Sequence, residues 1–171
     1  MSNNSCCCSG SDCCEPATEK RVITIDFLYL DLNVCVPCRG TDTSLDEALQ
    51  DVSNVLQATG VEVIVNKIHV TTEKQAEELK LLSSPTIRIN GQDIQLEVKE
   101  SLCPSCGDLC GDDIDCRVWV YQGKEYSVPP KAMIVEAVLK EVYGSKEVHP
   151  VDSPYVMPDN LKKFFSITST K

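Results

Sequence analysis

The sequence contains no long apolar run and no cluster of basic residues, and both absences narrow the classes of protein it can belong to. No stretch approaches the roughly eighteen consecutive apolar residues of a membrane-spanning helix. Lys and Arg together number 16, Asp and Glu number 26, and the net charge is -10 at pH 7. Binding to nucleic-acid phosphates draws on clustered Lys and Arg. The sequence therefore predicts neither a membrane span nor a nucleic-acid partner.

The N-terminus also lacks the features of a signal peptide. It begins Met-Ser-Asn-Asn-Ser-Cys, with neither a basic region nor an apolar one. We therefore expect a cytoplasmic protein. Because cytosolic thiols are mostly kept reduced, the 11 cysteines are expected to serve redox or metal chemistry rather than structural disulfides.

The cysteines fall into three groups along the chain. The groups are a tail with Cys6, Cys7, Cys8, Cys13 and Cys14, a pair formed by Cys35 and Cys38, and a segment with Cys103, Cys106, Cys110 and Cys116. The tail, residues 1–20, has no hydrophobic partner around which to fold, so we expect it to be disordered. Exposed thiols of this density suggest capture of thiophilic ions such as Cu(I), Hg(II) or As(III). The alternative is that these cysteines reflect compositional drift in a tail and have no function.

Hydrophobic periodicity predicts an α/β domain over residues 21–144. In chain order the pattern predicts strand, helix, strand, helix, two strands, a hairpin and a last helix, over residues 21–32, 44–60, 61–70, 72–82, 85–89, 93–98, 117–128 and 130–144. The first helix is placed at Ser44 because Ser44-Leu45-Asp46-Glu47 has the form of a capping box. Asn90-Gly91 is a strong signal for a hairpin turn. The result is a βαβαββα order, with a cysteine-rich insertion at 101–116 and an additional hairpin before the last helix.

Two motifs connect this order to a known family. Cys35-Val36-Pro37-Cys38 resembles the Cys-x-Pro-Cys variants of the thioredoxin superfamily, and Ser84-Pro85-Thr86 resembles its cis-proline step. The wider string looks like an uncharacterised cysteine-rich bacterial branch of that superfamily. The resemblance implies a thioredoxin-like fold in which Cys35 is the attacking thiolate, Cys38 is the resolving thiol, and Pro85 shapes the groove for a partner chain.

The predicted start of the first helix affects how these thiols are activated. A thiolate at a helix N-terminus is stabilised by the helix dipole and by free backbone amides. If the helix starts at Ser44, residues 39–43 form a loop and the thiols lie off the helix end. We then expect Arg39 to be the main positive charge near Cys35. A buried, inert pair is the alternative for Cys35 and Cys38.

The third group has the pattern of a metal site. Cys103-Pro-Ser-Cys106 has the form of a zinc knuckle, and Cys110 and Cys116 can complete a site of four thiolates. Zinc fits this spacing best, and an iron-sulfur cluster fits it less well. The alternative is a redox relay in which Cys103 and Cys106 exchange electrons with the Cys35/Cys38 pair.

A C-terminal extension, residues 145–171, carries adjacent aromatic side chains at Phe164 and Phe165. Two exposed phenylalanines are unusual in a tail. We expect them to pack on their own domain. The alternatives are docking on a second subunit, which would make a homodimer, or docking on another protein.

These observations support two functional hypotheses. The first is a thiol:disulfide oxidoreductase, in which Cys35 attacks a protein or small-molecule disulfide and Cys38 resolves the mixed disulfide without a cofactor. The same dithiol could also handle a thiol-bound soft metal or metalloid. The second hypothesis is a non-enzymatic protein that binds Zn, Cu, Hg or As through thiols.

Overall fold

The computed structural model describes residues 20–105, 113–145 and 153–169. The expectations for the N-terminal tail and for Cys106 and Cys110 concern residues outside these ranges. Within them, no helix is both long enough and apolar enough to cross a membrane.

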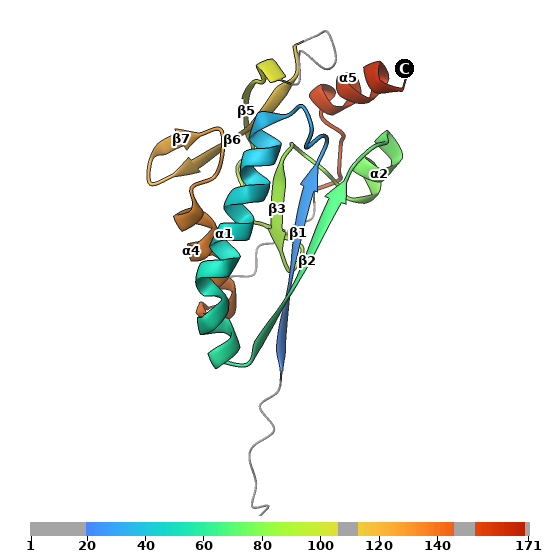
Figure 1. Cartoon of the computed structure of the whole chain (residues 1–171). Helices are drawn as coiled ribbons and strands as arrows, with labels where there is room; N and C mark the ends of the chain where they lie inside the picture. Colours follow the sequence, from blue (N-terminus) through green and yellow to red (C-terminus); the bar gives the residue numbers. More distant parts are fainter. Residues whose placement is uncertain (1–19, 106–112, 146–152, 170–171) are drawn as a thin grey trace, which may run out of the picture.

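A mixed sheet of four strands forms the centre of the α/β fold (Figure 1). Its strands are β1 (Arg21–Tyr29), β2 (Val61–His69), β3 (Thr86–Ile89) and β4 (Gln92–Asp93), in the order β2-β1-β3-β4. β1 pairs in parallel with β2 and antiparallel with β3. The chain therefore crosses over once between β1 and β2, through the first helix.

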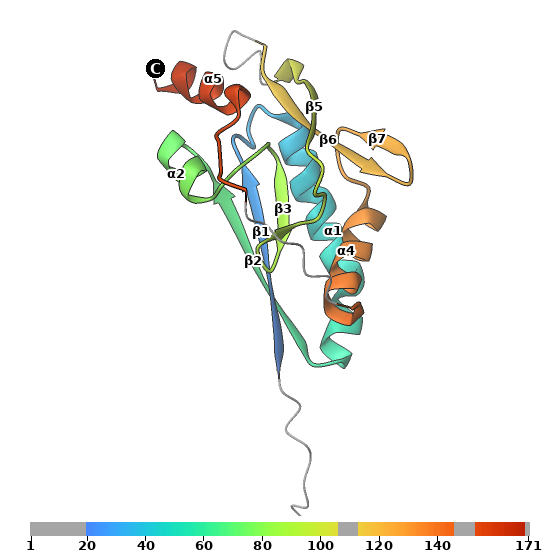
Figure 2. The ribbon, with the colours of Figure 1, turned by 180° about the vertical axis from the view of Figure 1, so that it is seen from behind.

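The hydrophobic core consists of two clusters, each with its own helices. The helices of the described residues are α1 (Val36–Ala58), α2 (Glu73–Glu78), α4 (Lys131–Tyr143) and α5 (Asp159–Thr168). α1 and α4 pack with alternate residues of β1, including Ile25 and Phe27. The second cluster contains Leu28 and Leu30 of the β1 region together with residues of α2 and α5. Both views place α5 beside α2, at the end of the sheet where β1 and β2 finish (Figure 2).

The prediction that α1 begins at Ser44 is wrong, because the helix begins at Val36. Cys35 is its N-cap, and Pro37 fits the first turn because the backbone N–H that proline lacks has no intrahelical partner there. The Ser44 hydroxyl instead donates to the carbonyl oxygen of Pro129, at 2.7 Å, and so ties the middle of α1 to the segment before α4. The Ser44 side chain is therefore used in a tertiary hydrogen bond and does not cap a helix.

Several local signals are confirmed. Asn90 and Gly91 have φ values of 51° and 83°, and Gln122 and Gly123 have 50° and 74°, as two-residue hairpin turns require. Thr72 caps α2 by accepting a hydrogen bond from the backbone N–H of Gln75. The helix predicted over 130–144 corresponds to α4.

The second hairpin belongs to a separate sheet that sequence analysis described only in part. β5 (Lys99–Leu102), β6 (Asp115–Tyr121) and β7 (Lys124–Tyr126) lie in the order β5-β6-β7. The strand predicted over 93–98 is wrong beyond Asp93, and the next pairing begins only at Lys99. Ser101 pairs with Cys116, and Leu102 with Asp115. Both ends of the predicted insertion are thus strand residues, and their pairing brings Cys103 close to Cys116.

The C-terminal phenylalanines are buried in their own domain, as expected. Phe164 and Phe165 meet edge to face, with ring centroids 5.5 Å apart, and Leu161 is buried beside them. All three belong to the cluster that contains Leu28 and Leu30. α5 is therefore part of the folded domain.

Replacing Phe165 by Ala should lower the free energy of unfolding by about 3–5 kcal/mol, because it removes a fully buried aromatic ring and leaves a cavity. Phe165 is 1% exposed, whereas Val156 in the same segment is 72% exposed. Val156→Ala is the matched control and should change stability by less than about 0.5 kcal/mol. Urea denaturation of the reduced protein measures both. Similar losses for the two variants would contradict the assignment of α5 to the core.

Candidate thiol site

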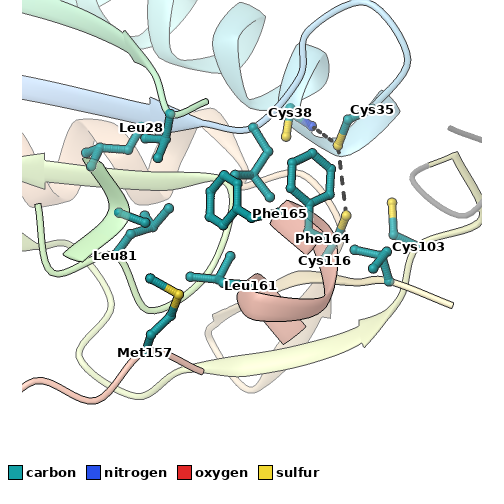
Figure 3. Close-up of a cluster of buried hydrophobic side chains, with 14 residues drawn as sticks. Leu28, Cys35, Cys38, Leu81, Cys103, Cys116, Met157, Leu161, Phe164 and Phe165 are labelled. Atoms are coloured by element: carbon teal, nitrogen blue, oxygen red, sulfur yellow. Dashed lines mark hydrogen bonds between the residues drawn. The ribbon is translucent and has the colours of Figure 1, made fainter. Parts of the chain in front are cut away.

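Four buried cysteines gather where α1 begins, beside the apolar side chains of α5 (Figure 3). Cys35 and Cys38 are each 1% exposed, Cys103 is 2% exposed and Cys116 is 5% exposed. No disulfide joins these four residues to one another. Phe164, Phe165 and Leu161 of α5 belong to the same cluster. The thiols are thus enclosed by apolar side chains.

Cys35 occupies the N-terminus of α1 directly. Its sulfur accepts a hydrogen bond from the backbone N–H of Cys38 at 3.3 Å. The N–H of Val36 donates to the Ser105 hydroxyl at 3.3 Å. The helix dipole and its first amides therefore stabilise negative charge on Cys35. The expectation that the thiols lie off the helix end is wrong.

Arg39 lies in α1 and not in the loop predicted over residues 39–43. Its guanidinium donates to the carbonyl oxygen of Asn33, at 3.4 Å. The observed hydrogen bond to the Cys35 sulfur comes from the helix backbone. That Arg39 is the main positive charge near Cys35 stays a prediction.

Cys35, Cys103 and Cys116 form a compact group. The sulfurs of Cys35 and Cys116 are 3.9 Å apart, and all three sulfurs lie within 4.8 Å of one another. Cys103 is held by its N–H, which donates to the carbonyl oxygen of Ile114 at 2.8 Å, and its sulfur lies 3.4 Å from the Ser105 hydroxyl. The three buried thiols can hold a single metal ion.

Cys38 lies to one side of this group and contacts the proline loop. Its sulfur is 3.6 Å from the Ser84 hydroxyl, which accepts a hydrogen bond from the N–H of Leu30. Hydrogen bonding to the Cys35 sulfur, then burial, then repulsion from charge on Cys35 raise the pKa of the Cys38 thiol far above its ordinary value. Cys38 is therefore protonated at neutral pH.

The proline predicted to shape the site is present in the expected form. The Ser84–Pro85 peptide bond is cis, and Pro85 is buried just before β3. The carbonyl oxygen of Ser84 accepts a hydrogen bond from the N–H of Arg117 at 3.0 Å. This bond connects the proline loop to β6, one residue after Cys116.

Arg117 is a structural residue that sequence analysis missed. Its fully buried guanidinium makes two hydrogen bonds to the Asp93 carboxylate, at 2.7 and 2.9 Å, and a third to the Thr86 hydroxyl at 2.8 Å. It also lies over the Trp119 ring, 4.6 Å from the ring centroid. No local signal marks this role, because Asp93 and Arg117 belong to different sheets.

The predicted metal ligands are only partly brought together in the described chain. Cys103 and Cys116 are neighbours, whereas Cys106 and Cys110 lie outside the described residues. Cys35, assigned by its motif to a redox pair, is the third member of the group. Spacing offered no signal for this, because Cys35 and Cys116 are separated by 81 positions.

The fold and the site together define an α/β protein with a cluster of buried thiols. Residues 23–138 match the family described as "Domain of unknown function (DUF2703)". This match covers more than half of the chain, and the chain belongs to that family. It includes all four buried cysteines and ends before α5. No curated protein and no solved structure matches the chain.

Replacing Arg117 by Met should destabilise the fold by about 3 kcal/mol or more, because it leaves the Asp93 carboxylate without its buried partner. Lys99→Met is the control. It removes an ion pair to Glu125 in which both side chains are about half exposed, and its loss should cost about 1 kcal/mol or less. Urea denaturation measures both changes. Equal effects would show that the Arg117–Asp93 pair is no more important than a surface pair.

The buried cysteines should react with iodoacetamide at least tenfold more slowly in the native protein than an exposed thiol, because alkylation requires contact between sulfur and reagent. Ser53→Cys supplies an exposed reference on α1, far along the helix from the thiols. Timed alkylation followed by peptide mass spectrometry reports each cysteine. Reaction of Cys35 at the rate of the reference thiol would contradict the shielding by α5.

Proposed function

We propose that this protein binds a soft metal or metalloid ion through Cys35, Cys103 and Cys116. The observation that carries the proposal is the spacing of the three sulfurs. Sulfurs about 2.3 Å from a common ion lie roughly 3.8–4.0 Å apart. The Cys35 and Cys116 sulfurs are separated by 3.9 Å, and the third lies within 4.8 Å of both. Small side-chain movements bring all three into a common coordination sphere.

The chemistry of the surroundings favours a soft ion. In the described part of the chain, the group close enough to share this ion consists of cysteines only. Thiolate ligands select ions such as Zn(II), Cu(I), Hg(II) and As(III), whereas Mg(II) and Ca(II) require oxygen ligands. The dipole of α1 offsets part of the negative charge that three thiolates bring into an apolar site. The bound cation offsets the rest.

The number of thiolates bears on the choice of ion. Structural zinc takes four ligands, and a fourth thiolate would have to come from Cys38, or from Cys106 or Cys110 outside the described residues. As(III) takes three sulfurs and needs no further ligand. We therefore propose As(III) as the first ion to test, and zinc, which the sequence favours, as the second.

A second candidate function, thiol:disulfide oxidoreductase, is favoured by the position of Cys35 at the N-terminus of α1. We propose along with it that the domain is thioredoxin-like. The order of the elements, the Cys-x-x-Cys pair at the start of α1 and the cis bond before Pro85 support this. The burial of Cys35 beside α5 weighs against a protein disulfide as the substrate. For this reason we place ion binding first.

Cysteine variants test the ion site, in a background where the five tail cysteines are replaced by serine so that only the domain is measured. We expect one As(III) per chain by equilibrium dialysis, and at least a tenfold loss of affinity in Cys35→Ser, Cys103→Ser and Cys116→Ser. Cys38→Ser is the matched control and should keep its affinity. Loss of binding in Cys106→Ser or Cys110→Ser with full binding in Cys35→Ser would replace this site by the one predicted from spacing.

Turnover of a small disulfide with a dithiol reductant separates the two functions. If the protein is an oxidoreductase of the Cys35/Cys38 type, Cys103→Ser keeps its turnover while Cys35→Ser loses it. If the protein is an ion binder, the wild-type chain shows no turnover above the uncatalysed rate. The first result would promote the second candidate over the proposal.

A further inference from the structure

Cys35 has thiol neighbours from two different parts of the chain. Cys38 follows it in α1, and Cys116 approaches it from β6. The motif pairs Cys35 with Cys38, whose thiol hydrogen-bonds to the Cys35 sulfur and also contacts the Ser84 hydroxyl. The Cys116 sulfur lies 3.9 Å from the Cys35 sulfur and, unlike Cys38, belongs with it and Cys103 to the three-thiol group (Figure 3). The geometry therefore offers Cys116 as a partner for Cys35.

We propose that oxidation joins Cys35 to Cys116 in a disulfide, and that this disulfide expels the ion from the three-thiol site. The expulsion rests on the proposed function, whereas the pairing of the two cysteines does not. The site would then hold its ion when reduced and release it when oxidised.

The approach that this bond requires is small. A disulfide has sulfurs about 2.05 Å apart, so the two sulfurs must move together by roughly 1.9 Å. Cys116 is fixed in β6 by its pairing with Ser101 and by the anchored Arg117 that follows. Cys35 lies between the short segment after β1 and the first turn of α1, where the backbone is not held in a sheet. We expect Cys35 to make most of the movement.

A peroxide is an oxidant small enough for an enclosed site. The Cys35 thiolate attacks one peroxide oxygen, the O–O bond breaks, and Cys35 becomes a sulfenic acid while hydroxide leaves. The Cys116 sulfur then attacks the Cys35 sulfur, the S–O bond breaks and a second hydroxide leaves. With the two thiol protons, the hydroxides become two waters. Two electrons pass from the two cysteines to one hydrogen peroxide.

The cysteine that pairs with Cys35 determines how many thiol ligands remain for the ion. A Cys35–Cys116 disulfide consumes two of the three ligands and leaves only Cys103. A Cys35–Cys38 disulfide would consume one and leave both Cys103 and Cys116 in place. Because a sulfur bound to the ion is not available to attack peroxide, we expect a bound ion to slow oxidation of Cys35 and Cys116.

Disulfide mapping of the ion-free, full-length chain tests the pairing. The reduced protein is treated with hydrogen peroxide, its remaining thiols are blocked, and cross-linked peptides are identified by mass spectrometry. We expect a Cys35–Cys116 cross-link in the wild-type chain and in Cys38→Ser. A Cys35–Cys38 cross-link in its place, or loss of the cross-link in Cys38→Ser, would overturn the proposal. The wild-type result requires no variant to fold.

Peroxide treatment of the chain whose five tail cysteines are replaced by serine, loaded with one equivalent of As(III), tests the expulsion. We expect release of the ion in step with the cross-link, with and without the further change Cys38→Ser, and oxidation at least tenfold slower than in ion-free protein. Retention of As(III) by the cross-linked protein would overturn the expulsion. Failure to bind As(III) at all would instead overturn the proposed function, and the mapping of the ion-free chain would still decide the pairing.

Discussion

The buried ion pair between Arg117 and Asp93 joins the two sheets of this protein. Asp93 belongs to β4 of the mixed sheet and Arg117 to β6 of the other. The same arginine reaches Thr86 on β3, and its backbone holds the carbonyl oxygen of Ser84. Because Cys116 precedes Arg117 in β6, this network sets the position of Cys116 against Cys35. The thiol site depends on a contact that contains no sulfur.

A second constraint is the start of α1. The Cys-x-Pro-Cys motif supplies its own N-terminus, with a sulfur as the capping group and a proline in the first turn. Gly40 extends the effect, because a Cβ at that position would lie 2.5 Å from the Val128 side chain. A glycine here lets α1 approach the segment that leads to α4. The N-terminus of α1 therefore lies at the thiol cluster, with Cys35 at the positive end of the helix dipole.

Local patterns predicted those parts of the fold that depend on near neighbours. The two hairpin turns, the cap at Thr72 and the α4 helix follow from residues within one turn of each other. The start of α1 could not be predicted in this way, because the Ser44 hydroxyl donates to the carbonyl oxygen of Pro129 and does not cap the helix. The early end of β4 could not be predicted either, because the chain leaves for the second sheet after Asp93. In the candidate site, Cys35, Cys38, Pro85, Cys103 and Cys116 could be named from the sequence. Their grouping could not, because it arises from the pairing of β5 with β6 and from the Arg117 network.

The aromatic side chains of α5 would affect how fast an ion at the proposed site is exchanged. Phe164, Phe165 and Leu161 pack in the same cluster as the four thiols, so opening of this cluster would expose the sulfurs to an ion. Such opening is a local unfolding event, with a free energy below that of the whole domain. The residence time of a bound ion would then be governed by the packing of a helix that contributes no ligand. Affinity and exchange rate would have separate structural origins, one in the sulfurs and the other in the C-terminal helix.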